Sequence, residues 1–139
     1  MEILLVEDSE SDAKLITKAF SRTEITPNFR VVKDGVEAVA FLYQQKPYDK
    51  MPRPDIIFLD LHLPKKDGLD VLAEIKSEPT LRNIPIIILT SSASQEDITK
   101  SYQMNANCYL TKPSTAEEFY RTVKIIEDFW LNIAKLPLD

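Results

Sequence analysis

Polar side chains that could do chemistry follow the apolar runs of this chain, at the point where each run ends. Glu7 and Asp8 follow the first run, Asp60 the third, Thr90 the fourth, and Lys112 lies just beyond the fifth. Carboxylates, a hydroxyl and an ammonium are the groups that bind a hard cation and the oxygens of a phosphoryl group. These residue types therefore suggest phosphoryl chemistry, provided that the fold brings them together.

The carboxylates and the cation that they require define this chemistry more closely. Neighbouring carboxylates repel one another and have raised pKa values unless a cation lies among them. Mg²⁺ meets that need because it prefers oxygen ligands. An aspartate beside the ion can attack a phosphoryl group, since carboxylates act as nucleophiles in aspartyl-phosphate chemistry. Thr90 and Lys112 would then hold the transferred oxygens.

The elements that must position these side chains alternate along the chain. Apolar or β-branched runs predict strands near residues 3–6, 27–33, 56–59, 86–89 and 107–110. Helical stripes predict helices from Ser9 or Ser11 to about Thr23, over 36–43, 69–75 and 95–104, and from Ser114 or Thr115 to about residue 135. Strands that alternate with helices imply right-handed βαβ units, a parallel sheet and helices on both faces. The functional side chains should then converge, because the carboxyl ends of parallel strands share one edge.

Two segments depart from this regular alternation. Prolines between Gln44 and Pro54 predict a loop at residues 44–54 that is longer than usual between a helix and a strand. In the final helix, Phe129 and Ile133 have the spacing of a core-facing stripe, whereas Trp130 lies off that stripe. Because an exposed apolar patch implies a partner, we expect Phe129 and Trp130 to contribute to a self-association or kinase-docking surface.

Composition limits the classes of protein that are possible. The chain has 139 residues, of which 44% are hydrophobic and 28% charged, as expected of one globular domain. A net charge of −5 argues against a large nucleic-acid footprint, and we expect no DNA partner. The single cysteine, Cys108, suits a reducing compartment. No apolar segment approaches the roughly 20 residues that span a bilayer, so we expect a cytoplasmic protein.

The same residues, in this order and spacing, resemble the receiver domain of two-component response regulators from end to end. The resemblance rests on the acidic pair after the first strand, Asp60 followed by Leu63-Pro64 and Asp67-Gly68, then Thr90, then Lys112-Pro113. It implies one receiver domain over residues 1–139 with a flavodoxin-like fold. This fold is a doubly wound, five-stranded parallel sheet of order 2-1-3-4-5 with five helices, the last one extended.

The resemblance also implies a role for each site residue. Asp60 would be the phosphoacceptor. Mg²⁺ would be bound by Asp8, Asp60 and the backbone carbonyl of His62, with Glu7 helping directly or through water. The acidic pair here is Glu-Asp, where Asp-Asp also occurs in the family.

The residues around the phosphoryl group would form the switch. By the resemblance, Thr90 bonds the phosphoryl group and reports its presence, and Lys112 pairs with it. Tyr109 would be the aromatic residue that turns inward when Thr90 moves. The Lys112-Pro113 peptide bond would be cis, as is usual in the family.

The function implied is a phosphorelay module with protein contacts as output. A histidine kinase would phosphorylate Asp60, and the surface of the fourth helix, fifth strand and fifth helix would change its affinity for a partner. The only reactions expected are the protein's own phosphorylation and dephosphorylation. The loop and the final helix look like those of the single-domain regulators of cyanobacterial phytochromes, which suggests a phytochrome kinase and a homodimer.

Other interpretations of the same residues remain open. A Mg²⁺-dependent aspartyl phosphatase would need a second aspartate two residues after the nucleophile, where this chain has His62. A receiver fold retained only for docking is the third possibility. Singly, Glu7 and Asp8 could be helix N-terminal acids, Thr90 a cap, Lys112 a solvated lysine and Tyr109 a packing residue. His62 alone cannot form a zinc site.

Overall fold

The computed structural model describes residues 1–20 and 27–137. Its elements follow in the order β1 (Glu2–Val6), α1 (Glu10–Phe20), β2 (Asn28–Val32), α2 (Gly35–Leu42), β3 (Ile56–Leu59), α3 (Gly68–Ser77), β4 (Ile86–Thr90), α4 (Gln95–Gln103), β5 (Cys108–Thr111), α5 (Ala116–Ile126) and the π-helix η1 (Glu127–Ile133). The expected end of the first helix near Thr23 lies outside the described residues. In the described part of the chain, no helix is both long and apolar enough to cross a membrane.

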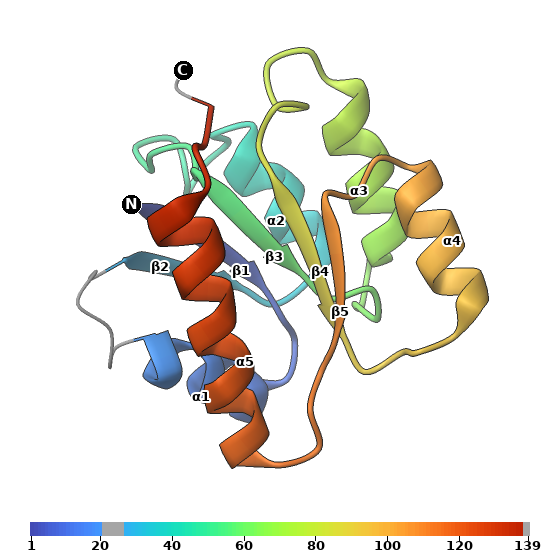
Figure 1. Cartoon of the computed structure of the whole chain (residues 1–139). Coiled ribbons are helices and arrows are strands. Elements are labelled where there is room, and N and C mark those ends of the chain that lie inside the picture. The colour runs from blue at the N-terminus through green and yellow to red at the C-terminus, as the bar shows by residue number, and fades with distance from the viewer. Residues whose placement is uncertain (21–26, 138–139) are drawn as a thin grey trace.

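The strands form one parallel sheet in the order β2-β1-β3-β4-β5, which confirms the expected doubly wound topology (Figure 1). The chain turns outward in opposite directions from β1 and β3, so the strand order reverses between them. This reversal places the carboxyl ends of β1 and β3 side by side, with Val6 paired to Leu59.

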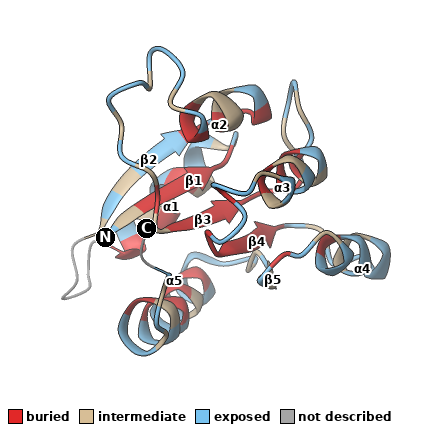
Figure 2. Cartoon of the chain, turned by 90° about the horizontal axis from the view of Figure 1, so that it is seen from above, coloured by how far each residue is buried: buried red, intermediate tan, exposed pale blue. Residues whose placement is uncertain are grey.

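Side chains of the central strands alternate between two cores, one on each face of the sheet. In β3, Ile57 and Leu59 pack on one face, while Ile56 and Phe58 pack on the other. The first face is covered by α2 and α3, and the second by α1 and α5. Figure 2 shows buried residues on both sides of β1, β3 and β4. A strand buried on both faces must be apolar throughout, which explains the continuous run at residues 56–59.

Capping side chains fix where the helices begin. The Asp12 N–H donates to Ser9 Oγ at 3.3 Å, so Ser9 rather than Ser11 caps α1. The Glu118 N–H donates to Thr115 Oγ1 at 3.2 Å, and Thr115 caps α5. Each cap satisfies an N–H group that has no partner within its helix. The start of α1 is thereby held beside the end of β1.

The last helix changes its geometry at Glu127. The Ala134 N–H donates to the Phe129 carbonyl, a bond across five residues that marks a π-helix. The wider turn carries the buried side from Ile126 to Leu131, five positions later. The expectation that Phe129 and Ile133 face the core is therefore wrong, because an α-helical period no longer applies there.

The connection between α2 and β3 is long, as expected, and it packs against α2. The ring of Tyr48 packs on Phe41 with centroids 5.3 Å apart, and its hydroxyl donates to Glu37 at 3.1 Å. Among the described peptide bonds, the cis bond is Lys46-Pro47. The Lys112-Pro113 bond is trans, contrary to the expectation from the resemblance.

Candidate functional site

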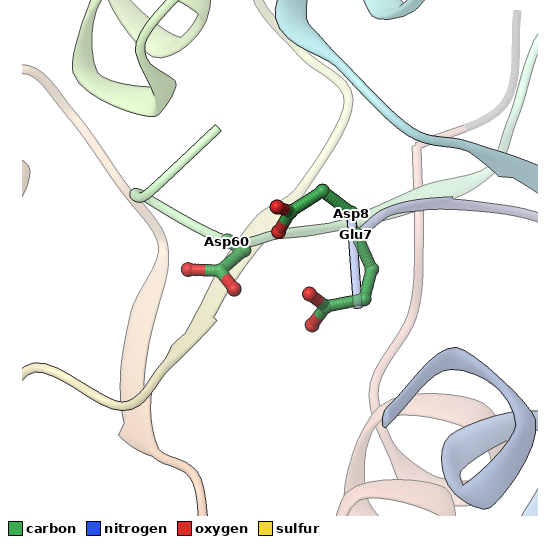
Figure 3. A group of neighbouring side chains, drawn as sticks. All are labelled: Glu7, Asp8 and Asp60. Carbon is green, nitrogen blue, oxygen red and sulfur yellow. The ribbon is translucent and has the colours of Figure 1, made fainter. Parts of the chain in front are cut away.

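The candidate site forms where β1, β3 and β4 end. The Asp60 N–H donates to the Val6 carbonyl at 3.1 Å, and the Lys112 N–H donates to the Thr90 carbonyl at 2.7 Å. These backbone bonds continue the sheet ladder past the last strand residues, and they hold Asp60 and Lys112 in register with their neighbours. Figure 3 shows the carboxylates of Glu7 and Asp8 extending toward that of Asp60.

Asp60 is buried, with both carboxylate oxygens in use. Oδ1 accepts hydrogen bonds from Thr90 Oγ1 at 2.8 Å and from the His62 N–H at 3.1 Å. Oδ2 accepts from Lys112 Nζ at 2.8 Å. Thr90 itself is fully buried at 0% exposure. The carboxylate is thus held in one orientation by a hydroxyl, a backbone amide and an ammonium.

Lys112 is the cation of this site in the described structure. Its side chain is 8% exposed, and Nζ lies 2.5 Å from Glu7 Oε1, 2.8 Å from Asp60 Oδ2 and 2.9 Å from Asp12 Oδ2. The ammonium therefore meets carboxylates from β1, β3 and α1 at once, and its donors match them in number. Carboxylates this close together require a cation among them, and Lys112 supplies one from the protein itself.

The charges shift the protonation equilibria of these groups in different directions. Burial would raise the pKa of Asp60, but hydrogen bonding and charge from Lys112, with the His62 amide and Thr90, hold it below its usual value. Burial would lower the pKa of Lys112, but its carboxylate partners raise it. Burial raises the pKa of Glu7 from 4.5 to about 7, although the bond to Lys112 opposes this. Asp60 thus remains ionised near neutrality, as a nucleophile requires.

Glu7, Asp8 and Asp60 also form a group that fits a divalent cation. One carboxylate oxygen from each lies within 4.8 Å of the others, with Glu7 and Asp60 buried and Asp8 exposed. A set of hard oxygen donors, open to solvent on one side, is what Mg²⁺ or Mn²⁺ prefers. Glu7 and Asp60 are shared between this group and Lys112, so a bound cation and the ammonium compete for them.

A close backbone contact supports the residue that would accept a phosphoryl group. A Cβ at Gly68 would lie 2.4 Å from the Asp60 carbonyl and 2.5 Å from Leu61 Cα. The Gly68 N–H donates to the Leu61 carbonyl at 2.9 Å. The Asp67-Gly68 pair therefore lets the start of α3 pack directly against the end of β3.

The proposed switch residues lie on one route from the site to the surface. From Thr90, the chain runs to Ser92, whose carbonyl accepts a hydrogen bond from the Tyr109 hydroxyl at 2.9 Å. The Tyr109 ring is half-buried against the core. The backbone after Thr90 is thus tied to the aromatic ring on β5.

Asp12 is the site residue that sequence analysis missed. It lies in the first turn of α1, and its spacing along the sequence does not reveal the contact, because that depends on how α1 is rotated toward Lys112. The carbonyl of His62 was expected to bind metal; the structure establishes the bond from its N–H to Asp60, and the carbonyl's role stays a prediction.

Comparison with known proteins identifies the class to which this fold and site belong. Residues 3–124 match the response regulator receiver domain family, and the chain belongs to that family. In this family a histidine kinase is the phosphoryl donor and an acidic pocket binds a divalent metal. Glu7, Asp8 and Asp60 form the acidic group of this chain.

Several members of the family are similar over nearly their whole length. The chain is 46% identical to the response regulator Rcp1 of Synechocystis sp. over 97% of this chain and 92% of that protein. The structure of the phosphorylated cyanobacterial phytochrome response regulator RcpA is 47% identical, with a TM-score of 0.95 over 99% of this chain and 98% of RcpA. The Mn²⁺-bound form of Rcp1 is 45% identical, with a TM-score of 0.95 over 99% of both chains.

Proposed function

We propose that this protein is a response regulator whose Asp60 accepts a phosphoryl group from a histidine kinase. The observation that carries the proposal is the pair of contacts on the Asp60 carboxylate, with Thr90 at one oxygen and Lys112 at the other, beside the acids Glu7 and Asp8. An oxygen of Asp60 forms the new bond to phosphorus, and the bond from phosphorus to the donor's imidazole nitrogen breaks. The imidazole leaves with the electron pair and takes a proton.

Each protein group has a defined part in this transfer. Glu7, Asp8, Asp60 and the His62 carbonyl would hold Mg²⁺, which neutralises charge on the transferred oxygens when bound. Lys112 would move from the carboxylate of Asp60 to the phosphoryl oxygens, because they carry the larger negative charge. The Thr90 hydroxyl, now bonded to Asp60, would follow in the same way.

This rearrangement supplies the switch. Movement of Thr90 changes the position of Ser92, and the bond from Tyr109 to the Ser92 carbonyl transmits the change to β5. We propose that Tyr109 turns inward in response and that the surface of α4, β5 and α5 changes its affinity for a partner. The output is contact with another protein.

Similarity to the cyanobacterial phytochrome regulators supports a more specific assignment. The kinase would be of the phytochrome type, the protein would act in the cytoplasm, and residues 1–139 would act as one receiver domain. The homodimer surface would include Phe129 and Trp130, whose rings contact at a centroid distance of 5.5 Å. Trp130 is half-buried against the core, whereas Phe129 is exposed together with Ile125 and Ile133, which are 64% and 67% exposed.

Intact mass after incubation with acetyl phosphate tests the assignment. The native chain should gain one phosphoryl group only when Mg²⁺ is present, and Asp60→Asn should gain none. Asp67→Asn serves as the control, since this exposed aspartate lies outside the acidic group. If the native chain forms neither an adduct nor a beryllofluoride complex, the phosphoacceptor assignment is wrong and a docking role takes its place.

A further inference from the structure

The partners of Lys112 fall into two kinds. Glu7 and Asp60 belong to the acidic group that fits a divalent cation, whereas Asp12 does not. Asp12 reaches Lys112 from the first turn of α1, with Oδ2 at 2.9 Å from Nζ. Its side chain is 32% exposed, and that of Lys112 is 8% exposed. The ammonium thus lies between a buried pair of carboxylates and one at the edge of the site.

A divalent cation and the ammonium make conflicting demands on the buried pair. Positive charges repel, and both require the oxygens of Glu7 and Asp60. Lys112 must therefore weaken its contacts with these oxygens when the acidic group is filled. Asp12 remains available as its partner throughout, because no oxygen of Asp12 belongs to that group.

We propose that Asp12 is a positioning residue that holds the Lys112 ammonium on the α1 side of the site and thereby raises the affinity of the acidic group for a divalent cation. This inference rests on the proposed function. Asp12 acts in two ways, and both raise the affinity for the divalent cation. It offers Lys112 a partner other than Glu7 and Asp60, and its charge offsets part of the repulsion between the ammonium and the incoming ion.

A plainer role for Asp12 is that of an acid in the first turn of a helix. Such acids interact favourably with the helix dipole wherever their side chains point. Glu10 lies in the same turn and pairs with Lys14 at 3.4 Å, with both side chains at least 70% exposed. Glu10 therefore shares the charge and the helix position of Asp12 without the contact to Lys112, and it provides the matched control.

Binding of Mg²⁺ to the unphosphorylated chain, measured by calorimetry, tests the inference. Asp12→Asn should raise the Kd for Mg²⁺ about tenfold, at the lower end of the range for groups that orient metal ligands. Glu10→Gln should change it less than about twofold, since an exposed charge is screened. Asp12→Glu should restore most of the affinity, because the longer side chain can still reach Lys112.

The double variant shows whether Asp12 acts through Lys112. In Lys112→Met, the further change Asp12→Asn should alter the Kd no more than Glu10→Gln does. Equal effects of Asp12→Asn and Glu10→Gln in the native background would overturn the inference, as would a full effect of Asp12→Asn without Lys112. If Lys112→Met does not fold, the single variants and the Asp12→Glu rescue still decide. Failure of the native chain to bind Mg²⁺ would instead count against the proposed function.

Discussion

The strand-end site and the outer face of the last helix differ in opposite directions from the usual rule that apolar groups are buried and polar groups exposed. At the site, Glu7, Asp60 and Lys112 are ionisable and buried, and each meets partners within 3 Å. On the last helix, the outer stripe of Ile125, Phe129 and Ile133 is apolar and 51% to 67% exposed. Among the described residues, Ile125 and Ile133 are the most exposed large apolar side chains.

The difference separates what folding requires from what association requires. Burying a charge costs free energy unless the charge is paired, so each buried residue of the site needs its partners to be present. An exposed apolar stripe contributes little to the stability of the folded monomer. It provides favourable free energy only when another protein surface covers it. Changes at the site should therefore alter stability, whereas changes on the stripe should alter association and leave stability almost unchanged.

The largest loss of stability is expected when the ammonium is removed from the site. Lys112→Met leaves Glu7 and Asp60 buried without their cation and should lower the free energy of unfolding by about 3 kcal/mol. Added Mg²⁺ should recover part of this loss, because it supplies charge to the same oxygens. Urea unfolding with and without the ion measures both effects.

An exposed ion pair provides the control for this change. Lys100 pairs with Glu96 at 2.7 Å, but both side chains are about half exposed or more. Lys100→Met should therefore cost less than about 0.5 kcal/mol. Equal losses of unfolding free energy in Lys112→Met and Lys100→Met would mean that burial of the Lys112 ion pairs does not add to their contribution to stability.

The packing of Gly68 against the Asp60 backbone predicts the next largest loss of stability. In an ordinary helix, replacing glycine by alanine is stabilising by roughly 0.5–1 kcal/mol. At Gly68 the new Cβ would lie 2.4 Å from the Asp60 carbonyl, which is backbone and cannot move aside freely. Gly68→Ala should therefore destabilise the protein by about 2 kcal/mol in urea unfolding. A stabilising result would show that the start of α3 can shift without disturbing Asp60.

The convergence of the site follows from the sequence because strand ends are easy to locate. The runs before Asp60 and Thr90 are continuously apolar, as strands buried on both faces must be. Parallel topology then places their carboxyl ends together without further information. The contact from Thr90 to Asp60 and that from Lys112 to Asp60 agree with this argument.

The details that the sequence could not provide depend on rotation about helix axes. Asp12 contacts Lys112 only because α1 is turned so that its first-turn acid faces the site. Phe129 and Ile133 fit an α-helical stripe by spacing alone, and only the π-helical bonds reveal that they point outward. A shift of one residue in the period moves a side chain from core to surface, and composition does not report it.

The buried glutamate of the site predicts a pH dependence of stability. Because the folded-state pKa of Glu7 is raised to about 7, the folded protein retains a proton there that the unfolded chain releases above 4.5. Stability of the metal-free protein should therefore fall as pH rises from about 4.5 to 7, with Glu7 contributing about 1–2 kcal/mol.

The neutral isostere isolates this contribution. The loss should be much smaller in Glu7→Gln, which carries no titrating group at that position. Asp60, whose folded pKa is lowered, loses its contribution only at more acid pH and does not mask the effect. Urea unfolding of both proteins in EDTA at pH 5 and 7.5 gives the comparison. The same pH dependence in both would assign it to another group.

The smallest effect on stability, and the largest on association, is expected on the outer stripe. Phe129 is 51% exposed, so Phe129→Glu should change the free energy of unfolding by less than about 0.5 kcal/mol. The same change places a charge in the proposed self-association surface and should shift sedimentation from dimer to monomer at every concentration tested. Val36→Glu is the control, because Val36 is 53% exposed on α2, across the sheet from the last helix. If the native chain sediments as a monomer in both phosphorylation states, the dimer is wrong, and the stripe must be covered by a different protein.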